Sequence, residues 1–553
     1  MPTFAPRTKL ATHKVFNQPA DFEGRNLFAD DLPLREASLR EGGSDLRPRL
    51  ARLGEVVGSE RVLELGAEAN RAVPELASFD RFGRRIDEVR FHPAYHELMG
   101  LAMEHGIHDV AWEPGRLRGG HVAHAAMLAT FSKAEAGTMC PINMTYAGVA
   151  ALRIEPDAVA PWLTGIVGGR YDPALRPIGE KCGLTLGMAM TEKQGGSDVR
   201  ANETRAYPLE GPGSRAVRLV GHKWFCSAPM SDGFLTLAQA KGGLTCFLVP
   251  RIAPDGTRNA IHLMRLKNKL GNRSNASAEI EYHDAYAERL GEEGRGVRTI
   301  IDMVHHTRLG TIAATLGLMG MALAQAVHHA KGRRAFGALL LDQPLMRGVL
   351  ADLAVEYEAS CVLVMRVARA FGETDETERA FARLGVALAK FWLTKRCPAF
   401  VAECMECLGG AGYVEESALP RLYREAPLNA IWEGSGNVIA LDILRTLSRE
   451  PAAGAAFAAE LASARGVDAR FDAAADALTG RFVADPPDER DARFVAERMA
   501  LLLQGALLLR HAPSPVAGAF VASRLRGDGG RLFGSFAGAF DVDAVLSRQT
   551  MSD

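Results

Sequence analysis

The segment Met188-Ala189-Met190-Thr191-Glu192-Lys193-Gln194-Gly195-Gly196-Ser197-Asp198 marks a change from helical to strand-like patterns along the chain. Its apolar residues lead into a polar turn with two glycines, as at the end of a strand. Gly195-Gly196 would let the backbone approach a flat ligand, and the Thr191 and Ser197 hydroxyl groups suit carbonyl or phosphate oxygens. Taken alone, an ordinary strand-to-loop turn explains this segment at least as well.

The patterns on the two sides of this segment predict different secondary structure. On the N-terminal side, apolar residues recur at three- and four-residue spacing, which predicts helices over 62–76, 95–103 and 121–131. On the C-terminal side, short runs bounded by Gly, Pro, Asp or Ser predict strands over 216–220, 234–240, 244–250 and 278–282. Helical patterns resume at Thr299 and continue to about Arg449.

These patterns predict an α+β protein of four parts. We expect an N-terminal helical domain over 1–180, a β-barrel or sheet domain over 181–300 and a C-terminal helical bundle over 301–449. A Pro- and Gly-containing stretch at 451–454 then precedes an extra helical region over 450–553. The order helices, sheet, helices leaves a crevice between sheet and bundle, which is a common place for a cofactor.

Composition is ordinary for a globular protein. The 553 residues are 47% hydrophobic and 24% charged, and the net charge of −1 gives no hint of a nucleic-acid or membrane partner. The longest apolar stretch, 311–327, is shorter than the roughly 20 residues of a membrane span, so a buried helix is the better interpretation. Eight cysteines are scattered, and the pair Cys404 and Cys407 is expected to be reduced core rather than a metal site. We therefore expect a cytoplasmic protein without a structural metal.

Two further segments carry residues that could hold a cofactor. Gly221-His222-Lys223-Trp224-Phe225-Cys226-Ser227 puts two aromatic side chains next to each other, which could form a wall for a ring, although plain core is their more common role. Gly332-Arg333-Arg334-Ala335-Phe336-Gly337, followed by Gln343, puts an arginine beside a tight turn. A guanidinium group there suits a diphosphate, and a solvated arginine at a helix end is an equally good interpretation.

A candidate base lies further along the chain, after the turn Leu408-Gly409-Gly410-Ala411-Gly412-Tyr413. In Ile431-Trp432-Glu433-Gly434-Ser435-Gly436-Asn437, one carboxylate stands between an indole and a turn of small residues. Burial beside an aromatic ring raises the pKa of a carboxyl group and makes it a stronger base near neutral pH. A glutamate that complements the dipole at a helix N-terminus explains this segment equally well on its own.

Together, in this order, the segments resemble the acyl-CoA dehydrogenase flavoprotein family over about residues 95–445. Lys269-Leu270-Gly271 matches the family's Lys-x-Gly loop. Longer strings resemble the AidB-like branch of that family, which belongs to the bacterial response to DNA alkylation. These strings are Thr191 to Asp198, Gly271-Asn272-Arg273-Ser274-Asn275-Ala276, Phe91-His92-Pro93-Ala94, Val15-Phe16-Asn17-Gln18-Pro19 and the segment around Glu433.

The resemblance implies that FAD lies between the sheet and the bundle. Glu433 aligns with the base that removes the proton α to the thioester carbonyl of an acyl-CoA, while hydride passes from the β carbon to flavin N5. Arg333 and Gln343 match positions that reach the FAD of a neighbouring subunit, which implies a homodimer or homotetramer. The remaining cofactor-binding positions that it implies are Met188, Ala189, Met190, Thr191, Gly196, Ser197, Phe225, Cys226, Ser227, Ile431, Trp432, Gly434, Ser435 and Asn437.

Several positions depart from the family pattern. Lys193 stands where a proline is usual, Phe225 replaces the usual tryptophan of the strand, and Trp432 replaces the tyrosine beside the base. Ala228 and Glu406 replace an asparagine and a glutamine. An indole and a lysine near the mouth would narrow the acyl pocket or change its charge, so these departures bear more on acyl-CoA turnover than on FAD binding.

The resemblance also implies that the C-terminal helical region binds double-stranded DNA. From Thr446 to Asp553 there are 12 arginines, no lysine and 14 acidic residues, so this region is not a basic tail. Arg524, Arg526 and Arg531 form the nearest approach to a cluster, and Arg445 matches an arginine of the AidB-like pattern. Solvated surface or ion pairs would explain all four equally. Three hypotheses follow, in order: a DNA-binding AidB-like flavoprotein, an acyl-CoA dehydrogenase for short or branched thioesters, and a flavin-stabilised scaffold.

Overall fold

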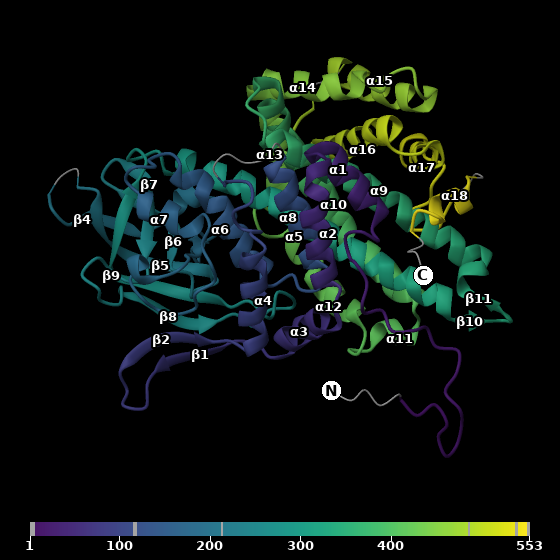
Figure 1. Cartoon of the computed structure of the whole chain (residues 1–553). Coiled ribbons are helices and arrows are strands. Elements are labelled where there is room, and N and C mark those ends of the chain that lie inside the picture. The colour runs from purple at the N-terminus through teal and green to yellow at the C-terminus, as the bar shows by residue number, and fades with distance from the viewer. Residues whose placement is uncertain (1–5, 114–118, 212–213, 485–486, 537–539, 550–553) are drawn as a thin grey trace.

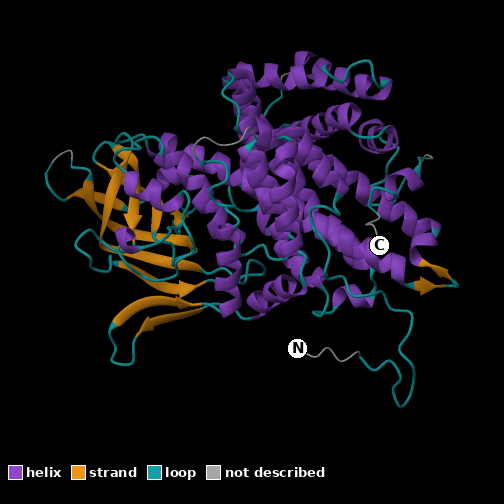
Figure 2. Cartoon of the chain, viewed as in Figure 1, coloured by secondary structure: helices purple, strands orange, loops and turns teal. Residues whose placement is uncertain are grey.

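Helices make up most of the molecule, and one sheet domain lies at its side (Figure 2). The computed structural model describes residues 6–113, 119–211, 214–484, 487–536 and 540–549. In this part of the chain, the N-terminal region contains α1 (Leu32–Gly42), α2 (Arg47–Val57), α3 (Glu60–Arg71), α4 (Pro93–Glu104), α5 (Gly120–Ser132), α6 (Met139–Leu152) and α7 (Ala160–Ile166). The predicted helices over 95–103 and 121–131 are thus α4 and α5.

The helix predicted over 62–76 is wrong at its C-terminal end. α3 stops at Arg71, and β1 (Glu75–Phe79) pairs antiparallel with β2 (Arg85–Arg90) to form a hairpin. Pro74 explains the difference, because proline lacks the N–H that a helix needs and disfavours helical geometry in the residue before it.

The sheet closes on itself. Along the path β6, β4, β5, β9, β7, each strand pairs with the next, and β7 pairs back to β6, while β3 and β8 add to β6 and β9. Each of the four predicted strands is present, extended at one or both ends. The strands are β3 (Leu186–Ala189), β4 (Arg205–Pro208), β5 (Ala216–Ser227), β6 (Gly233–Ala240), β7 (Gly243–Pro250), β8 (Ile261–Leu266) and β9 (Ser277–Leu290).

Alternate side chains of β6 show the two faces of this sheet. Leu235 and Leu237 pack with Tyr146 of α6 on the outer face, in the direction of the helices. Phe234 and Ala238 pack with residues of the other strands in the interior of the barrel. Because side chains alternate along a strand, a strand of this sheet that meets the helices has one face toward them and one toward the barrel interior.

The C-terminal bundle is built around α8 (Gly296–Gly332), which runs through the middle of the molecule (Figure 1). By length and composition, α8 is the one helix in the described residues that could cross a membrane, and 83% of its most apolar window is buried inside the protein. The other elements of the bundle are β10 (Arg334–Ala335), β11 (Ala338–Leu339), α9 (Pro344–Phe371), α10 (Glu376–Cys407), α11 (Gly410–Tyr413), α12 (Ala418–Glu425) and α13 (Gly436–Arg449).

The C-terminal region packs directly on the bundle rather than hanging from a linker. Pro451 is the first residue of the next helix, a position that proline favours, so the predicted boundary is a corner between two helices. Phe457 and Leu507 belong to the same apolar core as Val367 of α9. The helices here are α14 (Pro451–Ala462), α15 (Ala469–Ala484), α16 (Ala492–His511), α17 (Ser514–Phe520) and α18 (Val542–Leu546).

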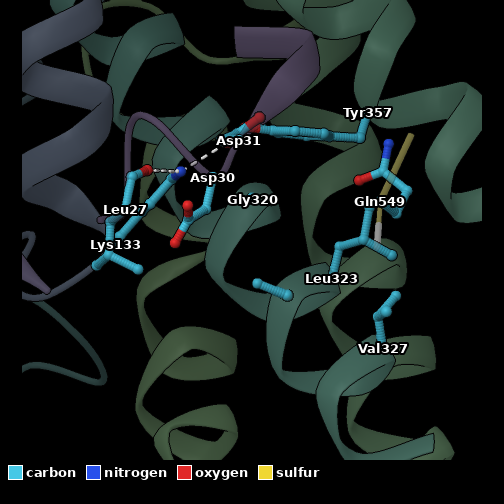
Figure 3. A pocket seen from close by; sticks show the side chains of 10 residues that line it. Leu27, Asp30, Asp31, Lys133, Gly320, Leu323, Val327, Tyr357 and Gln549 are labelled. Carbon is cyan, nitrogen blue, oxygen red and sulfur yellow. Dashed lines mark hydrogen bonds and ion pairs between the residues drawn. The ribbon is translucent and has the colours of Figure 1, made fainter. Parts of the chain in front are cut away.

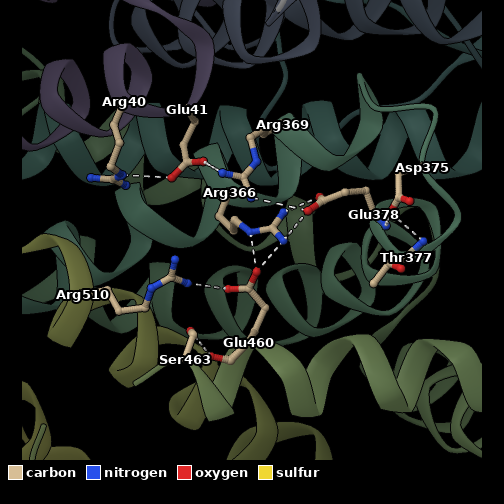
Figure 4. A network of polar contacts seen from close by, with 10 residues as sticks. All are labelled: Arg40, Glu41, Arg366, Arg369, Asp375, Thr377, Glu378, Glu460, Ser463 and Arg510. Atoms are coloured by element: carbon tan, nitrogen blue, oxygen red, sulfur yellow. Dashed lines mark hydrogen bonds and ion pairs between the residues drawn. The ribbon is translucent and has the colours of Figure 1, made fainter. Parts of the chain in front are cut away.

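Two buried polar clusters fasten the ends of the chain to the bundle. Figure 4 shows Arg366 of α9 between Glu378 of α10, at 2.8 Å, and Glu460 of α14, at 2.5 Å. Figure 3 shows Asp31, which accepts hydrogen bonds from Lys133 Nζ and the Tyr357 hydroxyl group at 2.6 and 2.5 Å. The first cluster holds the C-terminal region and the second holds the N-terminal segment.

Candidate active site

Glu433 lies in a tight turn between two helical segments. Its backbone has φ +56°, a left-handed conformation that residues with a Cβ rarely adopt, and Gly434 follows with φ +99°. A Cβ on Gly434 would approach Ile439 Cδ1 to 2.9 Å. The small residue after Glu433 is therefore required by the geometry of the turn.

Three polar side chains from the bundle hold this turn. Thr307 Oγ1 of α8 donates to Glu433 Oε2 at 2.7 Å. Arg308 Nε donates to the Glu433 carbonyl oxygen at 3.1 Å, and Lys390 Nζ of α10 donates to the Gly434 carbonyl oxygen at 2.5 Å. Two cations thus fix two consecutive carbonyl groups while a hydroxyl group orients the carboxylate.

The electrostatics of the turn favour a base. Burial raises the pKa of the Glu433 carboxyl group, and Thr307, Arg308 and Lys390 act against that rise. Lys390 is only 1% exposed, and its burial, together with Arg308, lowers its pKa to about 7. Arg308 is neutralised by Asp442 at 2.9 Å. The Glu433 carboxylate therefore binds a proton more tightly than an exposed one, although the positive charges of Arg308 and Lys390 limit this effect.

The predicted segments come together at this turn. Met188, Met190 and Trp432 all pack against one apolar cluster between the sheet and the helices. The Cys140 thiol of α6 has its pKa raised to about 12 by burial, and groups from the sheet, from its loop and from the turn act on it. These groups are Lys269, Glu433, Asn275 and Ser227. Segments that are remote in the sequence therefore converge on one place.

A buried ion pair joins the two strand segments that are expected to line FAD. Glu192 Oε1 accepts from Lys223 Nζ at 2.7 Å, and both side chains are 0% exposed. The amide N–H of Trp224 donates to the Thr191 carbonyl oxygen at 2.7 Å. This pairing sets Thr191 beside the end of β5, where Phe225 and Ser227 follow.

Two predicted lining residues point away from the crevice. Ala189 and Cys226 are fully buried in the barrel interior, so only their backbone atoms can line a cofactor. Phe225 and Ile431 have the opposite character, because they are 45% and 64% exposed. The Trp432 indole is fixed by a hydrogen bond from Nε1 to Asn429 Oδ1 at 3.0 Å.

The residues around the turn fit a flat, polar cofactor. A Cβ on Gly196 would approach Thr191 Oγ1 to 2.5 Å, so the backbone there must stay bare. Asn275 Oδ1 is buried without a hydrogen-bond partner among the described residues, next to the hydroxyl pair Ser227 and Ser277, whose oxygens are 3.2 Å apart. A ring with polar edges could donate a hydrogen bond to the free Asn275 Oδ1 and cover the exposed apolar side chains. Ser435 and Asn437 lie where α13 begins, and Asn437 accepts from Arg493 Nη1 at 2.8 Å.

Arg333 and Gln343 lie at the other end of the molecule, beside the β10–β11 hairpin (Figure 1). Arg333 follows the end of α8, whereas Thr307 is near its start, and 26 residues of helix span about 39 Å. In this chain Arg333 donates to the Asn17 carbonyl oxygen at 2.7 Å. Neither side chain can therefore reach the site of its own subunit.

The four arginines expected to bind DNA differ in their surroundings. Arg524 is a wrong prediction, because its side chain is 11% exposed and is held between Asp352 and Glu356. Arg526 is 61% exposed at 3.5 Å from Asp528, and Arg531 is exposed at the surface. Arg445 lies on α13, in a groove that Ser197 also lines and that none of the other three arginines lines.

Sequence reasoning missed Thr307, Arg308 and Lys390. Lys390 is a charged residue in a mainly apolar stretch of α10, and this is a signal that the sequence offers. Thr307 and Arg308 stand in a polar run with His305 and His306, so they carry no such signal. Cys404 and Cys407 are free and buried on α10, as expected. Among the residues that the structure describes, no three His, Cys, Asp or Glu side chains are grouped as metal ligands.

Comparisons with known proteins identify the domains of the chain. The model of the adaptive response protein AidB N-terminal domain matches residues 17–173, and the middle and C-terminal domains of acyl-CoA dehydrogenase match 187–285 and 294–448. The AidB acyl-CoA dehydrogenase of Escherichia coli K12 is 46% identical over 94% of this chain and 95% of its own. Acyl-CoA dehydrogenase family member 11 of Caenorhabditis elegans is 33% identical, over 72% of this chain and 66% of its own.

The fold comparison gives the same result. The crystal structure of C. elegans ACDH-11 in complex with C11-CoA has a TM-score of 0.83 and 27% identity, and the match covers 99% of this chain and 98% of that one. The predicted α+β fold is confirmed. The chain therefore belongs to the acyl-CoA dehydrogenase family, in its AidB-like branch, and is an FAD-dependent oxidoreductase acting on CH–CH groups.

Proposed function

We propose that this protein oxidises a short or branched acyl-CoA thioester, with Glu433 as the base that removes the α proton. The observation that carries the proposal is the Glu433 turn. Its carboxylate is partly buried, its pKa is raised by burial, and Thr307 orients it at 2.7 Å. When bound, FAD supplies the two-electron acceptor, which takes the hydride from the β carbon at N5.

The rigidity of the turn supports this role. A base abstracts a weakly acidic proton efficiently only if it is held in contact with it. Arg308 and Lys390 fix the backbone on both sides of Glu433, so the carboxylate has little freedom other than rotation of its own side chain. The Trp432 indole, fixed by Asn429, narrows the space next to the base and favours a short or branched acyl group.

The test is anaerobic mixing of the FAD-loaded protein with a panel of acyl-CoA thioesters, followed by flavin absorbance. We expect bleaching by short or branched thioesters and at least a thousandfold slower bleaching in Glu433→Gln, on the order of what loss of a catalytic base removes. Glu104→Gln, an exposed carboxylate at the end of α4, is the matched control. Equal bleaching in Glu433→Gln and the unchanged protein would contradict the assignment of the base.

A second proposed activity is binding of double-stranded DNA, as part of an adaptive response to alkylation. It is supported by the exposed Arg526 and Arg531 and by the match to the adaptive response protein domain. Duplex DNA titrated at several salt concentrations should bind less tightly as salt rises. Arg526→Ser with Arg531→Ser should weaken that binding. Absence of both duplex binding and flavin bleaching would favour a flavin-stabilised scaffold.

We further propose a homodimer or homotetramer in which Arg333 and Gln343 contact the FAD of a neighbouring subunit. The support is their position, about 39 Å of helix away from Thr307. Gln343→Ala should release FAD more readily at unchanged oligomer size, measured by flavin fluorescence and light scattering. Unchanged FAD affinity in this variant would contradict the proposal.

A further inference from the structure

The N-terminal arm, residues 15–25, crosses the end of α8 beside the β10–β11 hairpin (Figure 1). It is fixed to α8 at two places. His328 Nε2 donates to the Ala20 carbonyl oxygen at 2.7 Å. A Cβ on Gly332 would come within 2.6 Å of Pro19 Cα, so the arm lies directly on the helix backbone there. The arm is therefore a packed part of the bundle and not a loose tail.

The Asn17 side chain pairs with the outer edge of this hairpin. β10 and β11 have two residues each and form a two-stranded sheet. On the edge of β10 that faces away from β11, Asn17 Nδ2 donates to the Arg334 carbonyl oxygen at 2.9 Å, and Asn17 Oδ1 accepts from the Arg334 amide N–H at 2.7 Å. The side-chain amide thus forms the pair of hydrogen bonds that a third strand would form. A hairpin this short is marginal in water, so these two bonds contribute to its order.

The backbone of Asn17 makes a third contact with the hairpin and has an unusual conformation. Its carbonyl oxygen accepts from Arg333 Nη1 at 2.7 Å. Its φ is +60°, in the left-handed region that asparagine enters more readily than most residues with a Cβ. Asparagine therefore meets two requirements of this position, the backbone conformation and a side chain with one donor and one acceptor group. Glycine would meet only the first.

Both residues that are expected to reach the FAD of a neighbouring subunit are attached to β10. Arg333 directly precedes this strand, and its carbonyl oxygen accepts from the Leu340 amide N–H at 2.8 Å. Gln343 Nε2 donates to the Ala335 carbonyl oxygen at 3.1 Å. Phe336, in the turn of the hairpin, is fully exposed, so the hairpin projects from the surface of its own subunit. Loosening β10 would therefore displace Arg333 and Gln343 together.

We propose that Asn17 is a positioning residue for the cofactor. It clips the β10–β11 hairpin to the N-terminal arm and so holds Arg333 and Gln343 in place for the FAD of a neighbouring subunit. This inference rests on the proposed contact between those two residues and that FAD. The guanidinium group of Arg333 has five N–H donors in a rigid fork, and its hydrogen bond to Asn17 orients the fork without using all of them. A fork and a hairpin that are ordered before FAD binds lower the entropic cost of binding.

The experiment measures the dissociation constant of FAD from the FAD-loaded full-length protein, by the flavin fluorescence that appears on dilution. Asn17→Gly retains the left-handed backbone and removes only the side-chain amide. We expect this variant to raise the dissociation constant about 5- to 30-fold, in line with the loss of one or two hydrogen bonds. In Arg333→Gln/Gln343→Ala, adding Asn17→Gly should change it less than about twofold, because the clip acts through those two residues. Asp284→Gly, at another exposed left-handed residue, is the matched control and should leave it unchanged.

Amide hydrogen exchange at Arg334 separates this inference from the proposed function. Asn17→Gly should speed exchange of the Arg334 amide, whereas Asn17→Asp keeps an acceptor for that N–H and should leave exchange slow. If Arg333→Gln/Gln343→Ala does not change the dissociation constant of FAD, the proposed contact with a neighbouring subunit fails. Exchange at Arg334 then still decides whether the arm holds the hairpin.

Three results would overturn the inference. The first is unchanged exchange at Arg334 in Asn17→Gly. The second is full additivity of Asn17→Gly with Arg333→Gln/Gln343→Ala in FAD affinity, because the side chain would then act by another route. The third is a smaller oligomer in Asn17→Gly by light scattering, because the arm would then be an assembly contact and not a clip for the hairpin.

Discussion

Replacing Glu192 by glutamine should destabilise the barrel domain through a charge left without its partner. Lys223 Nζ is fully buried, and it donates hydrogen bonds to Glu192 Oε1 and the Leu237 carbonyl oxygen, each at 2.7 Å. Removing one member of a buried ion pair typically costs about 3–5 kcal/mol. The lysine can limit the cost by losing its proton. From its ordinary pKa of 10.5, deprotonation at pH 7 costs about 5 kcal/mol, which sets the upper bound.

The same reasoning predicts how the defect changes with pH. In the unchanged protein, burial lowers the Lys223 pKa to about 8, against the effect of Glu192. In Glu192→Gln, Lys223 is already neutral in the folded state at pH 7 but charged when unfolded. The unfolded state then binds more protons, so the stability of the variant rises with pH across the whole interval from 7 to 9. The stability of the unchanged protein rises only above about pH 8. The difference in stability between the unchanged protein and Glu192→Gln should therefore be about 1 kcal/mol smaller at pH 9 than at pH 7.

Urea unfolding at pH 7 and pH 9, followed by tryptophan emission and by release of FAD fluorescence, measures both quantities. Glu192→Gln with Lys223→Met removes both charges and should recover most of the lost stability. A loss below about 1 kcal/mol at pH 7, or a loss that is the same at both pH values, would refute the reasoning. The Glu192–Lys223 pair joins the segments of Thr191 and Trp224. In Glu192→Gln, FAD should therefore be released at a lower urea concentration than the concentration at which the helices unfold.

Three further changes test other parts of the structure. Lys390→Met should move the acid limb of the flavin reduction profile to higher pH, because it removes a cation that opposes the rise of the Glu433 pKa, whereas Lys390→Arg should leave the limb in place. Glu460→Gln should weaken the ion pairs of Arg366 and so increase the rate of amide hydrogen exchange in α14. An equal or slower rate would contradict a role of Glu460 in holding α14 on the bundle. Burial raises the pKa of Glu425 from its ordinary 4.5 to about 7. The folded state therefore holds a proton that the unfolded state releases, so the stability of the protein should fall as pH rises from 4.5 to 7. Glu425→Gln should flatten this dependence of the melting temperature on pH.

The sequence predicted those parts of the fold whose signal is local. The strand over 234–240 is β6, and the helical patterns that end near Arg449 end with α13 at that residue. Pro74 is the local signal for the end of α3, because a proline disfavours helical geometry in the residue before it. Closure of the barrel could not be predicted, because the decisive pairing joins Arg205 to Gln239 across a turn of the sheet.

The candidate site divides in the same way. Glu433, Trp432 and the lining segments could be found from the sequence because each lies in a contiguous motif. The directions of Ala189 and Cys226 depend on which face of the sheet meets the helices, and that is a tertiary fact. Arg524 looked like a surface cation, yet it neutralises Asp352 and Glu356 in the bundle, since the carboxylates that pair with it are more than 160 residues away.

The left-handed backbone of Glu433 ties the chemistry of the site to the packing of the bundle. A residue with a Cβ pays roughly 1 kcal/mol or more for this conformation, so the turn persists only where its surroundings determine it. Here the determinants come from α8 through Arg308 and from α10 through Lys390. On the next helix, Asn437 is held by Arg493 of α16, in the C-terminal region. Displacing that region would therefore disturb the first turn of α13, directly after Glu433, so the C-terminal helices help to position the candidate active site.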